Sequence, residues 1–257
     1  MSDNKRSGGQ NGGKNMLNKT QNQSNDRYQE FNDASRYSLG DRDIYAQYEY
    51  DGNGQKQIEF FKKYSNAFDL IDGMSDTDKE AFLAWARGEF MRGEGYRDFD
   101  DLPRYYQNLL KHYDKVLDKA TLSHGITVTR DTTAEILFGK GKLTGTLDEF
   151  KAMEGKNIFS KGSMSTGVAK TGLGIGSSSG KQVRLRIQIP GGSKGAGMWI
   201  GDKRIHGWGT KQLEFMTNRD SWFRVGKTVF DKASGMYIVN IKWIGHDKHD
   251  LGKKRKR

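Results

Sequence analysis

The sequence contains no cysteine, only two prolines and no long apolar run. Without cysteine there can be no disulfide framework, no thiol nucleophile and no thiolate metal site. No apolar stretch approaches the roughly 20 residues that span a membrane, and residues 1–19 lack the apolar segment of a secretory signal. We therefore expect no membrane partner. The expected location is the cytoplasm of the producing cell, or a target cell reached without a recognisable signal peptide.

Histidine is scarce as well, which bears on metal sites. The five histidines are scattered: His112, His124, His206, His246 and His249. His246 and His249 could share a metal ion, but a solvated turn near the C-terminus is the interpretation that their position favours. We predict no metal site.

Apolar residues are few and unevenly placed. Only 34% of the 257 residues are hydrophobic, and 33 are glycine. Residues 1–45 are rich in Asn, Gln, Gly, Ser and Lys, so they cannot bury enough apolar area to offset their chain entropy. We interpret them as a disordered polar N-terminal segment, a tether or a delivery segment. The remaining length is sufficient for a domain with a real hydrophobic core.

The net charge of +11 is concentrated in the second half of the chain. Residues 126–257 carry 25 basic and 11 acidic side chains, a net charge of +14. A field of this sign attracts polyanions and dinucleotides, although a basic solubilising surface would have the same composition. Residues 248–257 form a basic tail that we expect to be solvated, and that could also contact nucleic acid or act as a nuclear localisation signal.

From residue 56 the apolar spacing is helical. One face is formed by Ile58, Phe61, Phe68 and Ile71. Ser75 is placed as the N-cap of the next helix, and Thr146 with Glu149 forms a capping box further along. The clearest helix has Pro103 in its first turn and an apolar stripe that we assign to packing in the core, made of Leu102, Tyr105, Tyr106, Leu109, Leu110, Tyr113, Val116 and Leu117.

After residue 125 the pattern is mostly that of strands. The expected strands cover residues 126–130, 183–189, 212–216, 222–230 and 236–244. Helices followed by strands predict one α+β domain at 56–247, with a helical part at 56–125 and a β-rich part at 126–247.

Three short motifs lie on or beside these strands in a fixed order. Arg130 ends the first strand, Ser165 and Thr166 follow, and Gln212 and Glu214 stand at the head of a later strand. Each motif is common by itself in strands and turns. Because residues two apart on a strand point to one face, Gln212 and Glu214 would project together.

In this order and spacing, the three motifs resemble the signature of the arginine-serine-glutamate class of mono-ADP-ribosyltransferases. Residues 57–245 are similar to clostridial Rho-modifying exoenzymes and to the enzymatic components of binary actin-modifying toxins. The segment 95–100 resembles their helical Gly-Tyr-x-x-Ile-Asn motif, with Tyr96 and Asp100 in the matching places. The resemblance implies N-terminal helices packed on a two-sheet, mostly antiparallel β-sandwich, and NAD as co-substrate.

Cleavage of NAD at its nicotinamide bond creates positive charge on the ribose, as in glycoside hydrolysis. The resemblance implies that Arg130 binds the NAD phosphates and that Thr129, Thr166 and Tyr96 contribute to the cofactor site. A guanidinium is suited to this role because it binds phosphate oxygens bidentately.

The resemblance also assigns the catalytic and acceptor residues. Ser165 would orient Glu214, and Glu214 would bind the nicotinamide-ribose hydroxyl and stabilise the oxocarbenium ion. Gln212 would meet the acceptor, and Trp208 would take part in acceptor recognition. Family members that modify arginine have Glu at the position of Gln212, which argues against an arginine acceptor here.

The sequence therefore predicts a mono-ADP-ribosyltransferase, an effector or toxin, whose acceptor is a protein side chain other than arginine. Two alternatives remain. One is ADP-ribosylation of an RNA or DNA base, which the charge of the second half favours. The other is a non-catalytic basic nucleic-acid-binding or structural protein that retains the fold. Expected partners are NAD, the target macromolecule and an antitoxin or immunity protein.

Overall fold

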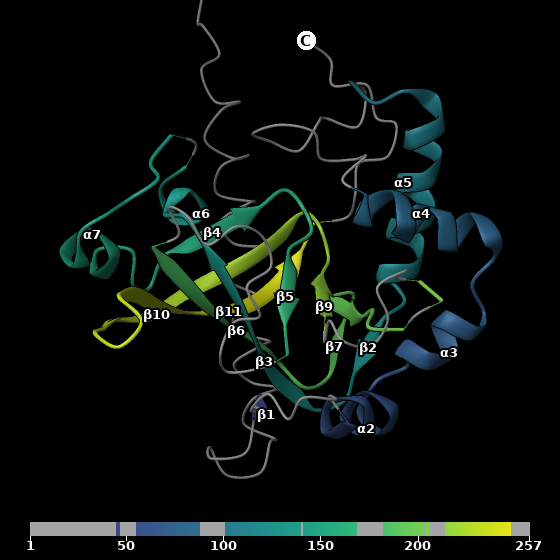
Figure 1. Cartoon of the computed structure of the whole chain (residues 1–257), viewed down its shortest axis with the longest axis horizontal. Coiled ribbons are helices and arrows are strands. Elements are labelled where there is room, and N and C mark those ends of the chain that lie inside the picture. The colour runs from purple at the N-terminus through teal and green to yellow at the C-terminus, as the bar shows by residue number, and fades with distance from the viewer. Residues whose placement is uncertain are drawn as a thin grey trace, which may run out of the picture. The chain divides into compact units, whose positions relative to one another are not determined.

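The computed structural model describes residues 55–87, 101–139, 141–168, 182–202, 204–205 and 214–247, together with the backbone of residues 45–46. Helices precede most of the strands, as the sequence predicts (Figure 1). The helices are α2 (Gln55–Tyr64), α3 (Ala67–Asp72), α4 (Asp76–Ala86), α5 (Arg104–Leu117), α6 (Glu135–Phe138) and α7 (Leu147–Lys151). The strands are β1 (Tyr45–Ala46), β2 (Thr121–Leu122), β3 (Gly125–Thr132), β4 (Asn157–Ser160), β5 (Ser165–Gly167), β6 (Val183–Ile189), β7 (Ser193–Lys194), β8 (Gly197–Trp199), β9 (Glu214–Thr217), β10 (Ser221–Asp231) and β11 (Met236–His246).

The first helical face is divided between two helices. Helix α2 ends at Tyr64, and Ser65 follows in an isolated bridge to Leu122. The Ser65 hydroxyl donates to the Phe61 carbonyl at 2.7 Å, which satisfies one carbonyl at the end of the helix. None of the helices in the described ranges has the length and apolar character that crossing a bilayer requires.

Helix α4 begins with the N-cap that the sequence predicts. Asp78 N–H donates to the Ser75 hydroxyl at 3.2 Å, and Ser75 N–H donates to the Asp78 carboxylate at 3.0 Å, which completes a capping box. His112 of α5 lies 2.7 Å from the same carboxylate. Burial opposes the charge of Asp78, but the bonds with Ser75 and His112 outweigh it and lower its pKa below 3.8.

We expect Ser75→Ala to reduce the free energy of unfolding by about 1 kcal/mol, since an N-cap hydroxyl contributes on this scale. The expected fall in Tm is about 2–4 °C for a domain of this size. A carboxyl group with a lowered pKa stabilises the fold above its unfolded-state pKa, and this stabilisation disappears as the pH falls through the folded-state value. The Ser75 hydroxyl also donates to the Asp78 carboxylate at 2.7 Å, so the loss should be complete at neutral pH and become smaller as the pH falls through the lowered pKa of Asp78. Thermal denaturation at a series of pH values measures both effects, and an equal loss at all pH values would contradict them.

Helix α5 begins at Arg104 with Pro103 as its N-cap, one residue before the first turn in which the sequence placed this proline, and most of its apolar stripe is buried. Leu109, Tyr113 and Leu117 are no more than 1% exposed. Tyr105 is the exception, with 58% of its surface exposed in the first turn of the helix, where its ring meets the edge of Tyr106. The prediction that Tyr105 belongs to the core stripe was wrong.

Within the described residues, nine strands join in one sheet, and along it the order is β4-β10-β11-β6-β3-β5-β9-β8 with β1 beside β3. Most neighbours are antiparallel, while β11 with β6 and β1 with β3 are parallel. Strands β3 and β5 meet at one register pair, Thr129 with Gly167. The α+β class and the mostly antiparallel arrangement are confirmed. The two sheets of the expected sandwich, however, are joined into one sheet by this contact between β3 and β5. Strand β1 lies before residue 56, where the sequence placed the start of the domain, and it pairs with β3.

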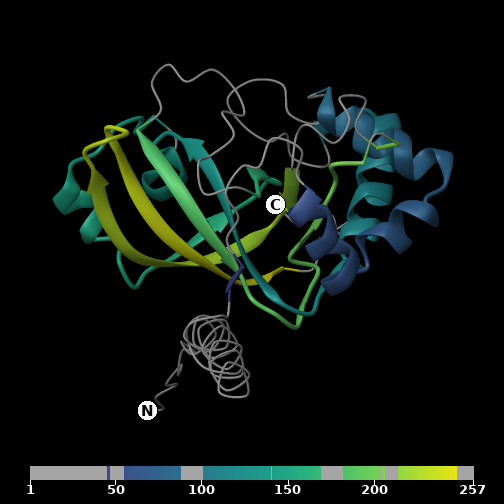
Figure 2. The ribbon, with the colours of Figure 1, turned by 60° about the horizontal axis from the view of Figure 1, so that its bottom comes forward.

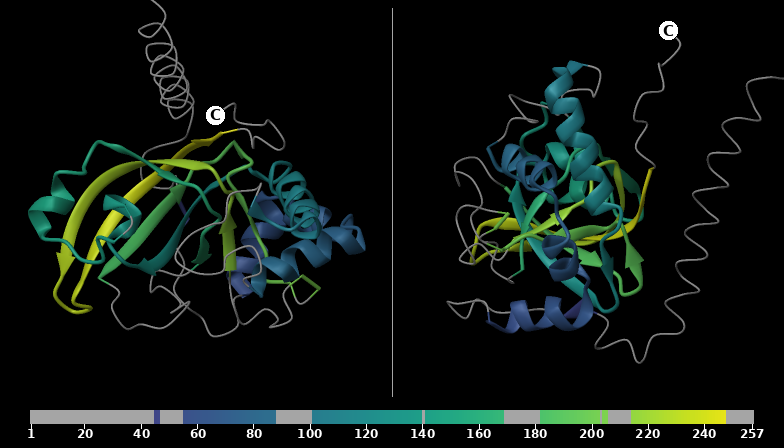
Figure 3. Two further views of the ribbon diagram at one scale, coloured as in Figure 1. Left: turned by 90° about the horizontal axis from the view of Figure 1, so that it is seen from above. Right: turned by 90° about the vertical axis from the view of Figure 1, so that its right-hand side faces the viewer.

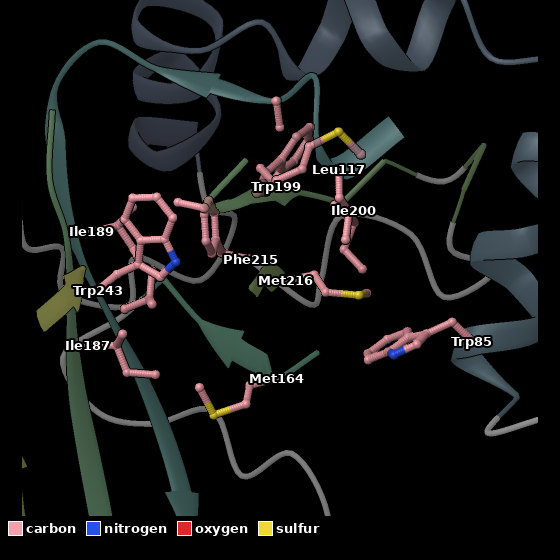
Figure 4. Close-up of a cluster of buried hydrophobic side chains, with 14 of the residues drawn as sticks. Trp85, Leu117, Met164, Ile187, Ile189, Trp199, Ile200, Phe215, Met216 and Trp243 are labelled. Atoms are coloured by element: carbon pink, nitrogen blue, oxygen red, sulfur yellow. The ribbon is translucent and has the colours of Figure 1, made fainter. Parts of the chain in front are cut away.

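Helices α2 to α5 gather beside β9 (Figures 1 and 3), and β8 pairs with β9 at this end of the sheet. The Phe61 ring of α2 lies 5.9 Å from Trp199 and 6.0 Å from Phe215, between ring centroids. Figure 4 shows Trp199 and Phe215 in the buried cluster that also contains Met216. This core fixes β9, the strand that begins with Glu214, against the helices.

Candidate active site

The three motif-bearing strands, β3, β5 and β9, are consecutive in the sheet (Figure 1). Strands β6, β7 and β8 separate β5 from β9 in sequence, yet β9 pairs directly with β5. The register places Gly167 opposite Glu214 and Ser165 opposite Met216. Since paired residues of antiparallel strands project to one face, Ser165 and Glu214 share a face of the sheet.

Glu214 is a buried carboxylate, with 2% of its surface exposed. The Ser165 hydroxyl donates a hydrogen bond to Glu214 Oε1. A buried carboxylate needs such donors, and a donor from a neighbouring strand also fixes the direction of the carboxylate plane. The pair therefore presents one oriented negative group at the beginning of β9.

Arg130 of β3 contacts the same serine. Its Nη1 atom donates to the main-chain oxygen of Ser165 at 2.7 Å. Ser165 thus contacts both partners, with its carbonyl toward Arg130 and its hydroxyl toward Glu214. A guanidinium carries five N–H donors in a planar fork, a geometry that suits a diphosphate.

The two threonines beside these residues hold the strands together. Thr166 is fully buried, and its hydroxyl donates to the Phe215 carbonyl across β5 and β9. Thr129 is 1% exposed, and its hydroxyl donates to the Gly167 carbonyl at 3.4 Å. Contact of either threonine with the cofactor stays a prediction.

An ion pair that the sequence did not reveal joins α5 to the segment just after β9. Asp114 of α5 is 1% exposed and accepts two bonds from Arg219, from Nε and Nη2, each at 2.7 Å. Arg219 is the second residue after the end of β9, and its Nη1 atom also lies 2.9 Å from the Asp220 carboxylate. Burial by itself would lower the pKa of the Arg219 guanidinium, but the bonds to Asp114 and the nearby negative charges raise it. The available signal was an aspartate beside the apolar stripe of the predicted helix.

A second ion pair adjoins Arg130. Arg184 of β6 donates two hydrogen bonds to Asp131, at 2.7 and 2.9 Å. The two residues are register partners on β3 and β6, and the bonds to Asp131 raise the pKa of Arg184. This bidentate pair fixes the end of β3 that carries Arg130.

The structure thus brings Arg130, Ser165 and Glu214 together. The other predicted site residues, Gln212, Trp208 and Tyr96, lie outside the described residues. Their roles stay predictions.

The family of the chain follows from residues 94–244, which match the model of the ADP-ribosyltransferase exoenzyme family. The chain belongs to this family. The protein is accordingly an NAD-dependent mono-ADP-ribosyltransferase, and the resemblance noted from the motifs is confirmed. No curated protein matches the chain.

Solved structures show the same fold for this ADP-ribosyltransferase. Plx2a, an ADP-ribosyltransferase toxin from Paenibacillus larvae, is 20% identical, with a TM-score of 0.60 over 77% of this chain and 98% of its own. C3stau2 from S. aureus, solved with NAD, is 14% identical, with a TM-score of 0.59 over the same shares. The enzymatic component C2-I of the Clostridium botulinum C2 toxin is 15% identical, with a TM-score of 0.54 over 79% of this chain and 50% of its own.

Proposed function

We propose that Arg130, Ser165 and Glu214 form the centre that cleaves NAD and passes ADP-ribose to a macromolecular acceptor. The observation that carries the proposal is the chain of contacts from Arg130 through Ser165 to Glu214. Arg130 binds the diphosphate, and Glu214 faces the ribose carbon where positive charge develops. Ser165 keeps the carboxylate in that direction. Electrostatic groups fixed in advance are the largest contribution in many such sites.

We assign the acceptor to protein side chains other than arginine, on the strength of Gln212. A neutral amide matches the hydrogen-bonding pattern of another amide, whereas a guanidinium calls for a carboxylate. A nucleic-acid base has an edge of the same kind, and the charge of +14 on residues 126–257 favours it. A nucleic-acid base is therefore the second candidate acceptor.

We expect Gln212→Ala to lower transfer by about 10-fold or more while NAD hydrolysis continues, because misplacing the acceptor slows only the step that needs it. Labelled NAD is incubated with the full chain and with lysate protein, purified RNA or purified DNA, and both nicotinamide release and retained label are measured. Label that protease removes identifies a protein acceptor, and label that nuclease removes identifies a nucleic acid.

Equal losses of hydrolysis and transfer in Gln212→Ala would contradict the role of Gln212 as an acceptor contact. Glu59→Gln, an exposed change on α2, is the matched control and should leave both reactions unchanged.

A further inference from the structure

The strands β4, β10, β11 and β6 have one apolar and one polar face. The apolar face is buried and includes Ile158, Phe223, Val225, Ile241 and Ile187. The residues between them, which alternate along each strand, project to the opposite face. Figure 2 shows β11, β6 and β3 running side by side, in yellow, green and teal. We call the opposite face of these strands the outer face.

Two aromatic side chains stand exposed on the outer face. Phe159 of β4 is 41% exposed and Trp222 of β10 is 36% exposed. They are register partners, and their ring centroids lie 4.8 Å apart at an interplanar angle of 46°. Trp222 Nε1 donates to Asp247 at 3.1 Å, which fixes the indole plane. The register partner of Trp222 on β11 is Gly245, which has no side chain.

Basic residues continue from this pair across the sheet. Arg224 is the register partner of Lys242, and Lys242 is the partner of Gln188 on β6. Arg186 lies two residues before Gln188 on the same face. Neighbouring strands are about 4.8 Å apart, so these cations form a row across the outer face. Burial lowers the pKa of the Lys242 ammonium, so an anion beside it would favour its charged form.

Two acidic side chains on this part of the sheet, Asp131 and Asp247, accept hydrogen bonds. Asp131 accepts from the Nε and Nη2 atoms of Arg184, and Asp247 accepts from Trp222 Nε1. Because Arg184 and Asp131 balance each other, the three cations Arg186, Arg224 and Lys242 outnumber the Asp247 carboxylate, and these residues together give a net positive field beside two exposed rings. This chemistry matches phosphates and unpaired bases rather than an acidic protein surface, which would not use the rings for stacking.

We propose that the outer face binds single-stranded nucleic acid. A base stacks on Phe159 and Trp222, and the phosphates lie along Arg224, Lys242 and Arg186. Binding here needs no NAD and no catalysis, so it goes beyond the proposed transfer reaction. A single strand is selected because its base faces are accessible, while those of a duplex are stacked on one another.

The test uses the full chain and a fluorescein-labelled oligouridylate of about 20 nucleotides, longer than the roughly 4–16 nucleotides that one such surface covers. Anisotropy titrations at several salt concentrations give Kd and its salt dependence. We expect Phe159→Ala/Trp222→Ala to weaken single-strand binding by about 5- to 150-fold, and binding of a duplex of equal length much less. Arg224→Ala/Lys242→Ala should reduce the slope of log K against log salt by about 1.4, or about 0.7 for each lost phosphate contact.

The matched control is Tyr105→Ala/Lys115→Ala, which removes one exposed ring and one exposed lysine from α5 and should leave binding unchanged. Nicotinamide release by the two outer-face variants should equal that of the original chain, so failure of this proposal and failure of the catalytic one are distinguishable. The proposal is overturned if the chain does not bind the single strand at about 0.15 M salt. It is also overturned if both outer-face variants bind as the original does. Should the aromatic variant lose its thermal transition, the salt slope of the charge variant decides.

Discussion

Glu214→Gln is expected to reduce the rate of NAD cleavage by about 10²-fold or more and to leave the fold intact. The carboxylate is 2% exposed and is oriented by the Ser165 hydroxyl. Glutamine has nearly the same shape and can still accept the bond from Ser165. The change therefore removes the negative charge without removing the packing, and the cost falls on the transition state in which the ribose becomes positive.

Nicotinamide release under saturating NAD measures this loss, and circular dichroism with thermal denaturation measures the fold. Glu59→Gln removes a carboxylate of the same type from the exposed side of α2 and should retain full activity. A non-catalytic basic protein with the same fold has no turnover to lose, so it predicts equal readings for all three proteins. Undiminished cleavage by Glu214→Gln would remove Glu214 from the mechanism.

The local elements could be predicted because their signals are short. The N-cap at Ser75 and the capping box at Thr146 depend on residues within one turn, and both are present. The alternation of β6 depends on a period of two, and its buried and part-exposed residues alternate throughout. The break after Tyr64 was not predicted, because the apolar spacing continues across Ser65 and the bridge to Leu122 is a long-range contact.

The site was predicted in part, for a different reason. Motif order and resemblance pointed to Arg130, Ser165 and Glu214, but spacing alone does not show that β9 pairs with β5. Three strands come between them in sequence, and only the completed sheet places Glu214 beside Ser165. The ion pair of Asp114 with Arg219 could not be predicted for the same reason, because its two residues are 105 positions apart and only the fold brings them together.

The second large expected effect is a loss of stability when the ion pair of Asp114 with Arg219 is broken. We expect Asp114→Ala to lower the free energy of unfolding by about 3 kcal/mol, since removing one partner leaves a buried guanidinium uncompensated. Asp220 stays 2.9 Å from Arg219 Nη1, which places the loss at the lower end of the range for buried pairs. At about 2–4 °C for each kcal/mol, the expected fall in Tm is about 6–12 °C. Differential scanning calorimetry of the full chain measures it.

The double variant Asp114→Leu/Arg219→Met shows whether the loss comes from an unpaired charge. Buried pairs replaced by apolar residues of similar volume often lose little stability, so the double variant should be more stable than Asp114→Ala. If Asp114→Ala lost less than about 1 kcal/mol, the pair would contribute no more than one at the surface.

The pair also bears on catalysis, because Arg219 follows closely after β9 and α5 holds this end of the strand through Asp114. Asp114→Ala should therefore lose NAD cleavage at a lower temperature than the original chain, in step with its own unfolding, whereas Glu214→Gln should be impaired at every temperature.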